Sequence, residues 1–210
     1  MSMFDQEWFE ERYRSAPALW SGQPNPQLVA DVAELAPGTA LDAGSGEGAD
    51  AIWLAERGWT VTAVDFSTTA LERSAAHAAQ RGESVSARID WRHADLTTWT
   101  PPEGSFDLVS AQYMHLPPEP RAALFARLAA AVAPRGTLLI VGHDLSDHAA
   151  GAHRPDMPEM FFTAREVAAS LAPDDWEVLV TESRPRPAKV HEGEEITVHD
   201  AVLLARRRED

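Results

Sequence analysis

Short apolar runs alternate along the chain with longer segments in which apolar residues recur every three or four positions. The short runs, each bounded by glycine, proline or polar residues, predict strands. They fall at Thr39–Leu41, Trp59–Asp65, Ala87–Trp91, Phe106–Ala111 and Thr137–His143. The longer segments predict helices at Ala49–Arg57, Thr69–Gln80 and Pro120–Val132. Strands that alternate with helices in this way predict an α/β fold, in which helices cover both faces of a mostly parallel sheet.

The amino end departs from this alternation. Apolar spacing predicts an amphipathic helix over residues 4–14, and Asn25 followed by Pro26 predicts the cap and first turn of a second helix. We therefore expect a single domain in which residues 1–36 form a helical arm on a core formed by residues 37–210.

The carboxyl end also differs, because its last two apolar runs are separated by a polar, proline-containing segment rather than by a helix. These runs, Trp176–Thr181 and Ile196–Leu204, predict an antiparallel hairpin that closes the sheet. A capping box at Thr163 predicts a helix before the hairpin. The long irregular segment 144–162 precedes that helix, and we expect it to form a lid over an acceptor pocket.

The amino-acid composition limits the kinds of molecule that the protein is expected to bind. The 210 residues include 18 Lys and Arg against 33 Asp and Glu, which gives a net charge of −15. This charge repels phosphate backbones and anionic lipid, so we expect neither a nucleic acid nor a membrane as partner. The absence of cysteine excludes disulfides, thiolate metal sites and a cysteine nucleophile. The first residues do not resemble a signal peptide, and we expect a cytoplasmic protein.

The segment Leu41–Asp50 carries the clearest chemical signal. Gly44, Gly46 and Gly48 lie between a predicted strand and a predicted helix, where glycines let the chain turn sharply and let a ligand approach the free N–H groups of the helix. The spacing Gly-x-Gly-x-x-Ala also fits a dinucleotide-binding turn, which makes a nicotinamide oxidoreductase one candidate. The carboxylate of Asp42 favours a different ligand, because it suits positive charge better than it suits a pyrophosphate.

With Asp42 before its three glycines, this segment resembles the first motif of class I S-adenosylmethionine-dependent methyltransferases. The resemblance spans almost the whole chain. It implies a Rossmann-like, doubly wound sheet closed by a C-terminal antiparallel hairpin, with S-adenosylmethionine as cofactor. Within this family the chain is most similar to the small bacterial tellurite-resistance methyltransferases, relatives of the thiopurine methyltransferases. The tellurite enzymes have a His-Arg pair in the last loop, whereas this chain reads His191-Glu192, which puts an oxyanion substrate in doubt.

Further residues are assigned to the cofactor site. Asp65 ends the second predicted strand at the same sheet edge as the glycine turn, where it can accept both ribose hydroxyls. Phe66 can lie against adenine, and the resemblance implies that Asp95 binds the adenine amino group. The structural alternatives are a helix cap for Asp65, a loop residue for Asp95 and a packing residue for Trp20. The predicted cofactor-binding residues are Trp20, Asp42, Gly44, Gly46, Gly48, Asp65, Phe66, Asp95, Leu96 and Gln112.

The acceptor is less well defined. We expect a small molecule with a sulfur, selenium, tellurium, nitrogen or oxygen nucleophile. A soft nucleophile needs little help from a base, whereas an oxygen or nitrogen acceptor can lose a proton to His115 or Tyr113, which follow the fourth strand. Alternatively, His115 only fixes its loop. Metal-type ligands also cluster after the fifth strand, but such clusters are common in solvated loops, and we predict no metal site. These ligands are His143, Asp144, Asp147 and His148.

Two other functions share these motifs. A nicotinamide oxidoreductase would bind the reduced dinucleotide. A non-catalytic protein that senses S-adenosylmethionine would bind it tightly without turning over any acceptor.

Overall fold

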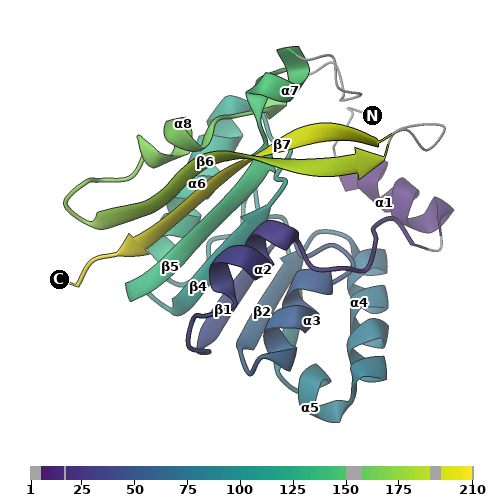
Figure 1. The fold of residues 1–210 in the computed structure, drawn as a ribbon. Coiled ribbons are helices and arrows are strands. Elements are labelled where there is room, and N and C mark those ends of the chain that lie inside the picture. Colours follow the sequence, from purple (N-terminus) through teal and green to yellow (C-terminus); the bar gives the residue numbers. More distant parts are fainter. Residues whose placement is uncertain (1–5, 17, 150–157, 190–194, 210) are drawn as a thin grey trace.

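One seven-stranded sheet forms the centre of the molecule (Figure 1). The computed structural model describes residues 6–16, 18–149, 158–189 and 195–209. The strand order is β3-β2-β1-β4-β5-β7-β6. Six strands run in the same direction, and β7 runs in the opposite direction between β5 and β6. The predicted α/β sheet, mostly parallel and closed by an antiparallel hairpin, is thereby confirmed. The strands are β1 (Thr39–Ala43), β2 (Thr60–Asp65), β3 (Ile89–His93), β4 (Phe106–Gln112), β5 (Val132–His143), β6 (Trp176–Lys189) and β7 (Glu195–Arg207).

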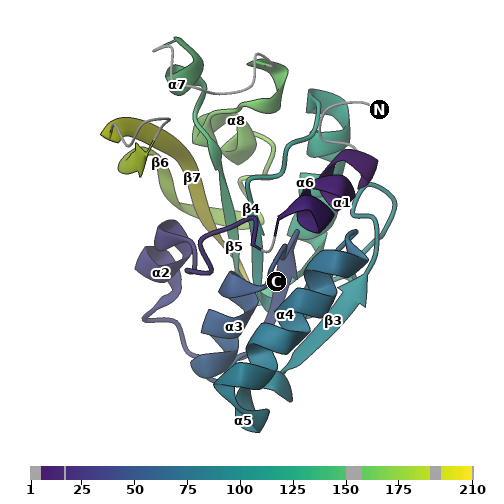
Figure 2. The same ribbon diagram turned by 90° about the vertical axis from the view of Figure 1, so that its right-hand side faces the viewer.

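Helices cover both faces of this sheet (Figure 2). They are α1 (Gln6–Ser15), α2 (Pro26–Val32), α3 (Ala49–Glu56), α4 (Thr68–Arg81), α5 (Glu83–Ser86), α6 (Pro118–Ala131), α7 (Leu145–Ala149) and α8 (Ala164–Ala168), with a 3-10 turn η1 (Pro158–Met160). The core on one face includes side chains of α2 to α5, and the core on the other includes side chains of α6 and α8. α1 packs beside α4. The proposed division into an arm and a core stays a prediction.

Alternation along the strands supplies both halves of the core. In β1, Ala40 packs with α2 and α3, whereas Leu41 packs with α6, and both side chains are fully buried. Successive strand residues point to opposite faces, so a strand covered on both sides reads as a continuous apolar run. This is why such short runs were sufficient to predict the central strands.

Several boundaries differ from the predicted ones. β3 begins at Ile89, because residues 83–86 form the short helix α5, which the apolar pattern did not predict. β4 extends to Gln112, which therefore ends the strand instead of opening the loop. β5 already begins at Val132, so the Pro-Arg-Gly segment expected to precede the strand lies within it. There Arg135 has a φ of +65°, and the register between β4 and β5 shifts.

The closing hairpin is longer than predicted. β6 continues to Lys189 through Pro185 and Pro187, in a segment that was expected to be a loop. β6 is the outermost strand, and proline is tolerated there because its missing N–H can face away from the neighbouring strand. Residues 190–194, which include the His191-Glu192 pair, lie outside the described residues.

The predicted lid is described only in part. α7 and η1 lie in this segment, and residues 150–157 lie outside the described residues. The capping box predicted after it is present at Thr163, whose side chain accepts from the Glu166 N–H while Glu166 accepts from the Thr163 N–H. The lid function stays a prediction.

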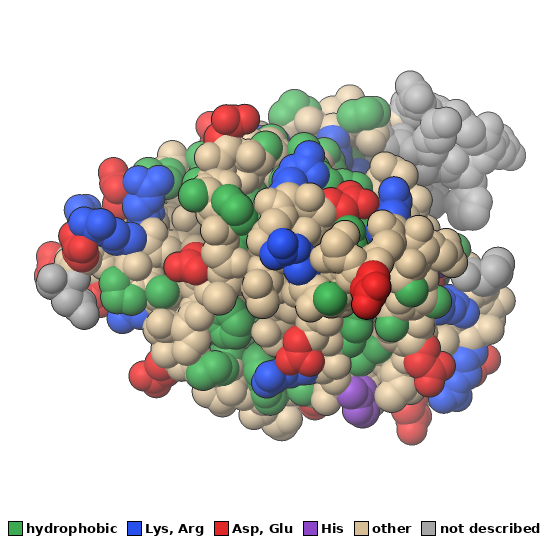
Figure 3. Space-filling model, turned by 90° about the horizontal axis from the view of Figure 1, so that it is seen from below, with side chains coloured by type: hydrophobic (Ala, Val, Ile, Leu, Met, Phe, Trp, Pro, Cys, Tyr) green, Lys and Arg blue, Asp and Glu red, His purple; other side chains and the backbone are tan. Residues whose placement is uncertain are grey.

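Two surface properties bear on the predicted partners. No helix in the described ranges is long and apolar enough to cross a membrane. On the face drawn in Figure 3, Lys and Arg side chains are dispersed among acidic and apolar ones. This dispersal agrees with the charge argument, and the exclusion of nucleic acid stays a prediction.

Candidate functional site

The glycine turn lies where the strand order reverses. β1 pairs with β2 on one side and with β4 on the other. In open parallel sheets, ligands bind at the carboxyl edge beside such a reversal. The N–H groups of Gly44 and Ser45 both donate to the carbonyl of Val64, at 2.8 and 3.0 Å, which holds the turn against the end of β2. The turn therefore has a defined place at the edge where a ligand is expected.

The turn depends on its glycines for both conformation and space. Gly44, Gly46 and Gly48 have φ values of +78°, +51° and +82°, in the left-handed region that side chains disfavour. A Cβ on Gly48 would lie 2.6 Å from the Trp91 ring and 2.8 Å from the Cβ of Ser74. Larger residues are therefore excluded from this turn by packing as well as by backbone strain.

Unsatisfied acceptors gather beside the turn. Asp42 is only 2% exposed, and its Oδ2 makes no hydrogen bond in the described structure. The same holds for Oε1 of Gln112 and Oγ of Ser45. Burial raises the pKa of Asp42, and the negative charges of Asp50 and Asp65 raise it further. A ligand that carries positive charge and N–H donors would satisfy these oxygens and favour the ionised carboxylate.

Asp65 holds the turn from the end of β2. One of its carboxylate oxygens accepts the N–H of Gly46 at 2.8 Å, and the other accepts the N–H of Ser67 at 2.9 Å. Ser67, and not Asp65, is the N-cap of α4, because its hydroxyl accepts the N–H of Ala70. Each carboxylate oxygen can accept a second hydrogen bond, so the ribose role predicted for Asp65 is compatible with these contacts and stays a prediction.

The residues predicted to bind adenine follow β2 and β3. The Phe66 ring lies 5.7 Å from the ring of Phe9, measured between centroids, so the arm reaches this part of the site. Asp95 is exposed, and one of its oxygens accepts the N–H and the hydroxyl of Thr97 at 2.8 and 2.7 Å. The Leu96 side chain is buried in the core. Their roles toward adenine stay predictions.

The N-terminal arm lies over the glycine turn. Nε1 of Trp20 donates to the hydroxyl of Tyr13 at 3.1 Å, and a Cβ on Gly46 would lie within 3.3 Å of both atoms. Trp20 is 52% exposed, whereas Tyr13 is only 3% exposed. The sequence analysis did not single out Tyr13, which is the buried aromatic anchor of the arm. Trp20 thus lies against the turn, where it was predicted to cover the cofactor.

Two glutamates that the sequence analysis missed fix the arm. Glu47, within the turn, is buried and accepts the N–H of Trp20 at 3.0 Å and Nη1 of Arg73 at 2.9 Å. Glu10 of α1 accepts the hydroxyl of Thr69 at 2.6 Å, at the start of α4. No local pattern could have identified these partners, because each contact joins segments that lie far apart in the chain.

Four rings form a second feature of this edge, which we call the aromatic cluster: Tyr113, His115, His143 and Phe161. The His143 ring lies 4.6 Å from Tyr113, 5.3 Å from His115 and 6.0 Å from Phe161, measured between centroids. Tyr113 has a φ of +52°, which is uncommon for a bulky residue and marks local strain at the end of β4. The predicted candidate base His115 thus lies among aromatic rings.

Met114 joins the aromatic cluster to the glycine turn. A Cβ on Gly44 would lie 2.8 Å from the Met114 sulfur, so this side chain packs directly on the first glycine. The residues on either side of Met114 both belong to the cluster. The turn and the cluster are therefore adjacent parts of one site.

An ion pair that the sequence analysis did not predict borders the cluster. Asp200 of β7 is fully buried, and its Oδ2 accepts Nε of Arg186 at 2.8 Å and Nε2 of Gln27 at 3.2 Å. The Arg186 guanidinium carbon lies 5.8 Å from the Tyr113 ring centroid. Burial and the charge of Asp200 raise the pKa of the Tyr113 hydroxyl to about 12.

The acidic residues after β5 have other partners. Oδ1 of Asp144 accepts the N–H and hydroxyl of Ser146, and Asp147 accepts the N–H of His199 and lies 3.0 Å from its Nδ1. The described residues contain no group of three or more side chains arranged to hold a metal ion. The His148 side chain lies outside the described residues.

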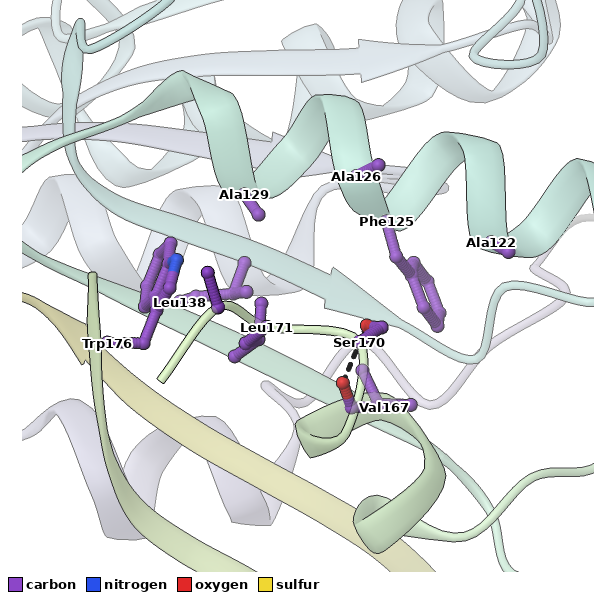
Figure 4. Close-up of a pocket in the computed structure, with 10 residues that line it drawn as sticks. Ala122, Phe125, Ala126, Ala129, Leu138, Val167, Ser170, Leu171 and Trp176 are labelled. Carbon is purple, nitrogen blue, oxygen red and sulfur yellow. Dashed lines mark hydrogen bonds between the residues drawn. The ribbon is translucent and has the colours of Figure 1, made fainter. Parts of the chain in front are cut away.

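A separate cavity of about 190 Å³ lies between α6 and α8 (Figure 4). It borders Leu138 in the middle of β5 and Trp176 at the start of β6. Its lining contains no ionisable side chain and therefore offers no group for acid–base chemistry. Among the lining residues are Ala122, Ala126, Ala129, Leu138, Val167 and Trp176.

Comparison with known proteins identifies the central part of the chain. Residues 40–136, which include the glycine turn, Asp65 and β4, match the family described as "Methyltransferase domain". This segment is similar to methyltransferase domains. The 2-heptyl-1-hydroxyquinolin-4(1H)-one methyltransferase of Mycobacteroides abscessus is 31% identical over 150 residues, 66% of this chain and 65% of that protein. The chain thus spans less than two thirds of that relative, and the match to others covers 48% of their length.

Solved structures are similar in fold to nearly the whole chain, and not only to residues 40–136. The structure reported for the conversion of a disulfide bond into a thioacetal group during echinomycin biosynthesis is 26% identical, with a TM-score of 0.73. The match covers 96% of this chain and 92% of that one. TehB from Haemophilus influenzae shares the fold at 19% identity and a TM-score of 0.69, covering 97% of this chain and 67% of TehB. The predicted placement in the tellurite-resistance and thiopurine group is not confirmed by this likeness.

The comparisons also bear on the cofactor. The N-methyltransferase NodS from Bradyrhizobium japonicum, solved with S-adenosylhomocysteine, has a TM-score of 0.66 at 17% identity, covering 96% of this chain and 97% of NodS. The likeness to NodS shows a shared fold, and the match to the methyltransferase family supports S-adenosylmethionine as the cofactor. The buried acceptors beside the turn fit the ammonium and sulfonium charges of that molecule.

Proposed function

We propose that this protein transfers a methyl group from S-adenosylmethionine to a small aromatic acceptor. The observation that carries the proposal is Asp42, a buried carboxylate with an unsatisfied oxygen directly before the glycine turn. A cationic ligand stabilises such a carboxylate, whereas the pyrophosphate of a dinucleotide would bring a second negative charge to it. Asp42 therefore favours S-adenosylmethionine over a nicotinamide cofactor.

The chain has a residue for each part of this ligand. Asp42 and Gln112 face its cationic end. The glycine turn leaves space for the ligand beside the main chain, and Asp65 and Phe66 lie where its ribose and adenine are expected. When bound, the cofactor supplies a methyl group on a positively charged sulfur. The protein positions the two reactants and excludes water, and the arm residue Trp20 contributes to this cover.

The aromatic cluster is the expected acceptor site. It adjoins the glycine turn through Met114. The rings of Tyr113, His115 and His143 are partly exposed and suit a planar molecule, whereas Phe161 is buried beneath them. The curated relative described above is named for a hydroxyquinolinone, which is a planar heteroaromatic compound. This supports an aromatic acceptor here, without specifying which atom is methylated.

The two predicted proton acceptors are not equivalent. A Tyr113 hydroxyl with a pKa of about 12 stays protonated at neutral pH and cannot accept a proton there. His115 lies in the cluster beside His143, and its imidazole is a side chain that can accept a proton near neutral pH. His115 is thus the better candidate for any base that an oxygen or nitrogen acceptor requires.

The first experiment is calorimetric titration of the purified protein with S-adenosylmethionine, S-adenosylhomocysteine and NADH. We expect binding of the first two and not of the third. NADH binding without S-adenosylmethionine binding would overturn the proposal and restore the oxidoreductase alternative.

A second measurement tests turnover. Incubation with methyl-labelled S-adenosylmethionine and a panel of aromatic acceptors, 2-heptyl-1-hydroxyquinolin-4(1H)-one among them, should transfer label to at least one compound. Tight cofactor binding without transfer to any acceptor would support the non-catalytic sensor instead.

A further inference from the structure

Two arginines of β6 lie two residues apart and are held very differently. Arg184 donates from its two terminal nitrogens to both oxygens of Asp31, at 2.8 and 3.1 Å, and from Nε to Glu182 at 2.7 Å. Its Nη1 also donates to Oε1 of Gln27 at 3.3 Å, so all three guanidinium nitrogens have described acceptors, and Arg184 ties β6 to α2. In the described structure Arg186 donates through Nε to Asp200 at 2.8 Å, and its side chain also interacts with the hydroxyl of Tyr113. No described carboxylate accepts from its two terminal nitrogens.

The surroundings of Arg186 orient its guanidinium. Asp200 is fully buried and is held in turn by Gln27, so it fixes the guanidinium through Nε. Among the described residues, the other ionisable group that faces the guanidinium is Tyr113, whose ring centroid lies 5.8 Å from the guanidinium carbon. Asp200 is thus a positioning residue for Arg186, and the fork borders the aromatic cluster.

The position of Arg186 matters in a protein with a net charge of −15. Most of the surface repels anions, whereas a partly buried cation beside an aromatic cluster attracts them. A planar guanidinium fork matches an oxygen anion by charge and by geometry. A purely structural arginine, such as Arg184, would leave no donors on this side.

We infer that Arg186 binds an ionised oxygen of the acceptor, so that the substrates are aromatic compounds with an acidic hydroxyl group. This inference rests on the proposed function and names its substrate class. The hydroxyl loses its proton to water on binding, because the guanidinium stabilises the anion. The oxygen lone pair then forms the new O–C bond while the C–S bond breaks, and that electron pair stays on the sulfur of S-adenosylhomocysteine. No side chain has to act as a general base.

The test uses the full chain loaded with S-adenosylhomocysteine and the probe 4-nitrophenol, whose ionised form absorbs visible light. We expect the pKa of the bound probe to fall by about one unit or more, which is roughly a tenfold preference for the phenolate. Arg186→Gln should abolish the shift. The matched control Arg184→Gln removes a neighbouring guanidinium of the same strand and should leave the shift in place.

Arg186→Gln also leaves the buried Asp200 without its cation, which can unfold the protein. The double variant Arg186→Gln with Asp200→Asn removes both charges and should fold while showing no shift. Arg186→Lys keeps the charge without the planar fork and should retain part of the shift. Thermal unfolding of each variant identifies those that are folded.

The inference is overturned if the wild-type protein binds no 4-nitrophenol, if it binds both forms equally, or if the folded double variant keeps the shift. Titration of the same samples with S-adenosylmethionine separates this result from the proposed function. Cofactor binding without phenolate preference overturns the substrate class alone, whereas loss of cofactor binding overturns the methyltransferase proposal.

Discussion

The glycine turn and the aromatic cluster lie side by side at one edge of the sheet, but different interactions hold them. Around the turn, backbone N–H groups donate to Val64 and to Asp65, and packing leaves no space for a Cβ on Gly48. Around the cluster, ring contacts and one buried ion pair, Arg186 with Asp200, hold the side chains. The turn is fixed mainly by the main chain, and the cluster mainly by side chains.

This difference corresponds to what each part has to recognise. A cofactor that never changes suits a site built from backbone and buried acceptors, in which almost any substitution is costly. An acceptor site built from side chains can change its specificity by substitution while the fold stays intact. Substitutions in the two parts should therefore have separable effects on stability, cofactor binding and acceptor binding.

The largest expected effect is that of Gly48→Ala on stability. The new Cβ would meet Trp91 and Ser74 in a left-handed backbone conformation, and the two costs together reach about 2–4 kcal/mol of unfolding free energy. Gly104→Ala is the control, because Gly104 has a φ of +59° and nothing within 4 Å of an added Cβ. It should cost only about 1 kcal/mol in urea unfolding. Equal losses would show that packing does not fix the turn.

Asp42→Asn should have opposite effects on stability and on cofactor binding. Burial raises the folded pKa of Asp42 above its unfolded value, so the stability that this group contributes is present at low pH and lost as pH rises through the folded pKa. At pH 8 the asparagine should therefore raise the unfolding free energy, and at pH 4 it should do so by much less.

The pH dependence of cofactor binding should depend on the same carboxylate, that of Asp42. In the wild-type protein, affinity for S-adenosylmethionine should rise with pH as Asp42 ionises. In Asp42→Asn it should be about tenfold to a hundredfold lower and no longer follow that ionisation, because a charge-assisted contact is lost. Calorimetry over this pH range measures both properties. Unchanged affinity in the variant would contradict the role assigned to this carboxylate.

The smallest effect is expected in the aromatic cluster. His115→Ala should weaken binding of an aromatic acceptor by about twofold to tenfold, the value of one ring contact, and leave the affinity for S-adenosylmethionine unchanged. His93→Ala is the reciprocal control, because His93 contacts the Phe66 carbonyl on the cofactor side. A turnover loss far above tenfold in His115→Ala, with acceptor affinity kept, would instead identify His115 as a general base.

The glycine turn and its place at the sheet edge could largely be predicted from the sequence, because their determinants are local. Asp42 and Gly44 to Gly48 are contiguous, and the position of Asp65 follows from the length of one strand-helix-strand unit. What could not be predicted there are contacts across the fold, such as that of Glu47 with the arm. Short-range patterns contain no information about which distant segment packs on a turn.

The ion pair beside the aromatic cluster could not be predicted, for the same physical reason, although Tyr113 and His115 of the cluster were identified as candidates. Gln27 and Asp200 are 173 positions apart in the chain and meet only when β7 takes its place beside β5. Arg186 was assigned to a loop, because the prolines beside it appear to end a strand. They are compatible with β6 only because it is the outermost strand, a property of the whole sheet that no local window contains.

Those prolines have a consequence for how the molecule meets other copies of itself. The outer edge of a sheet can pair with a strand from another chain and so start aggregation. Pro185 and Pro187 lie two positions apart in β6 and so share one edge of the strand, and proline in a sheet is confined to edges where the missing N–H faces solvent. Along this stretch an incoming strand would find too few donors to pair, which protects the sheet from growing beyond its own chain.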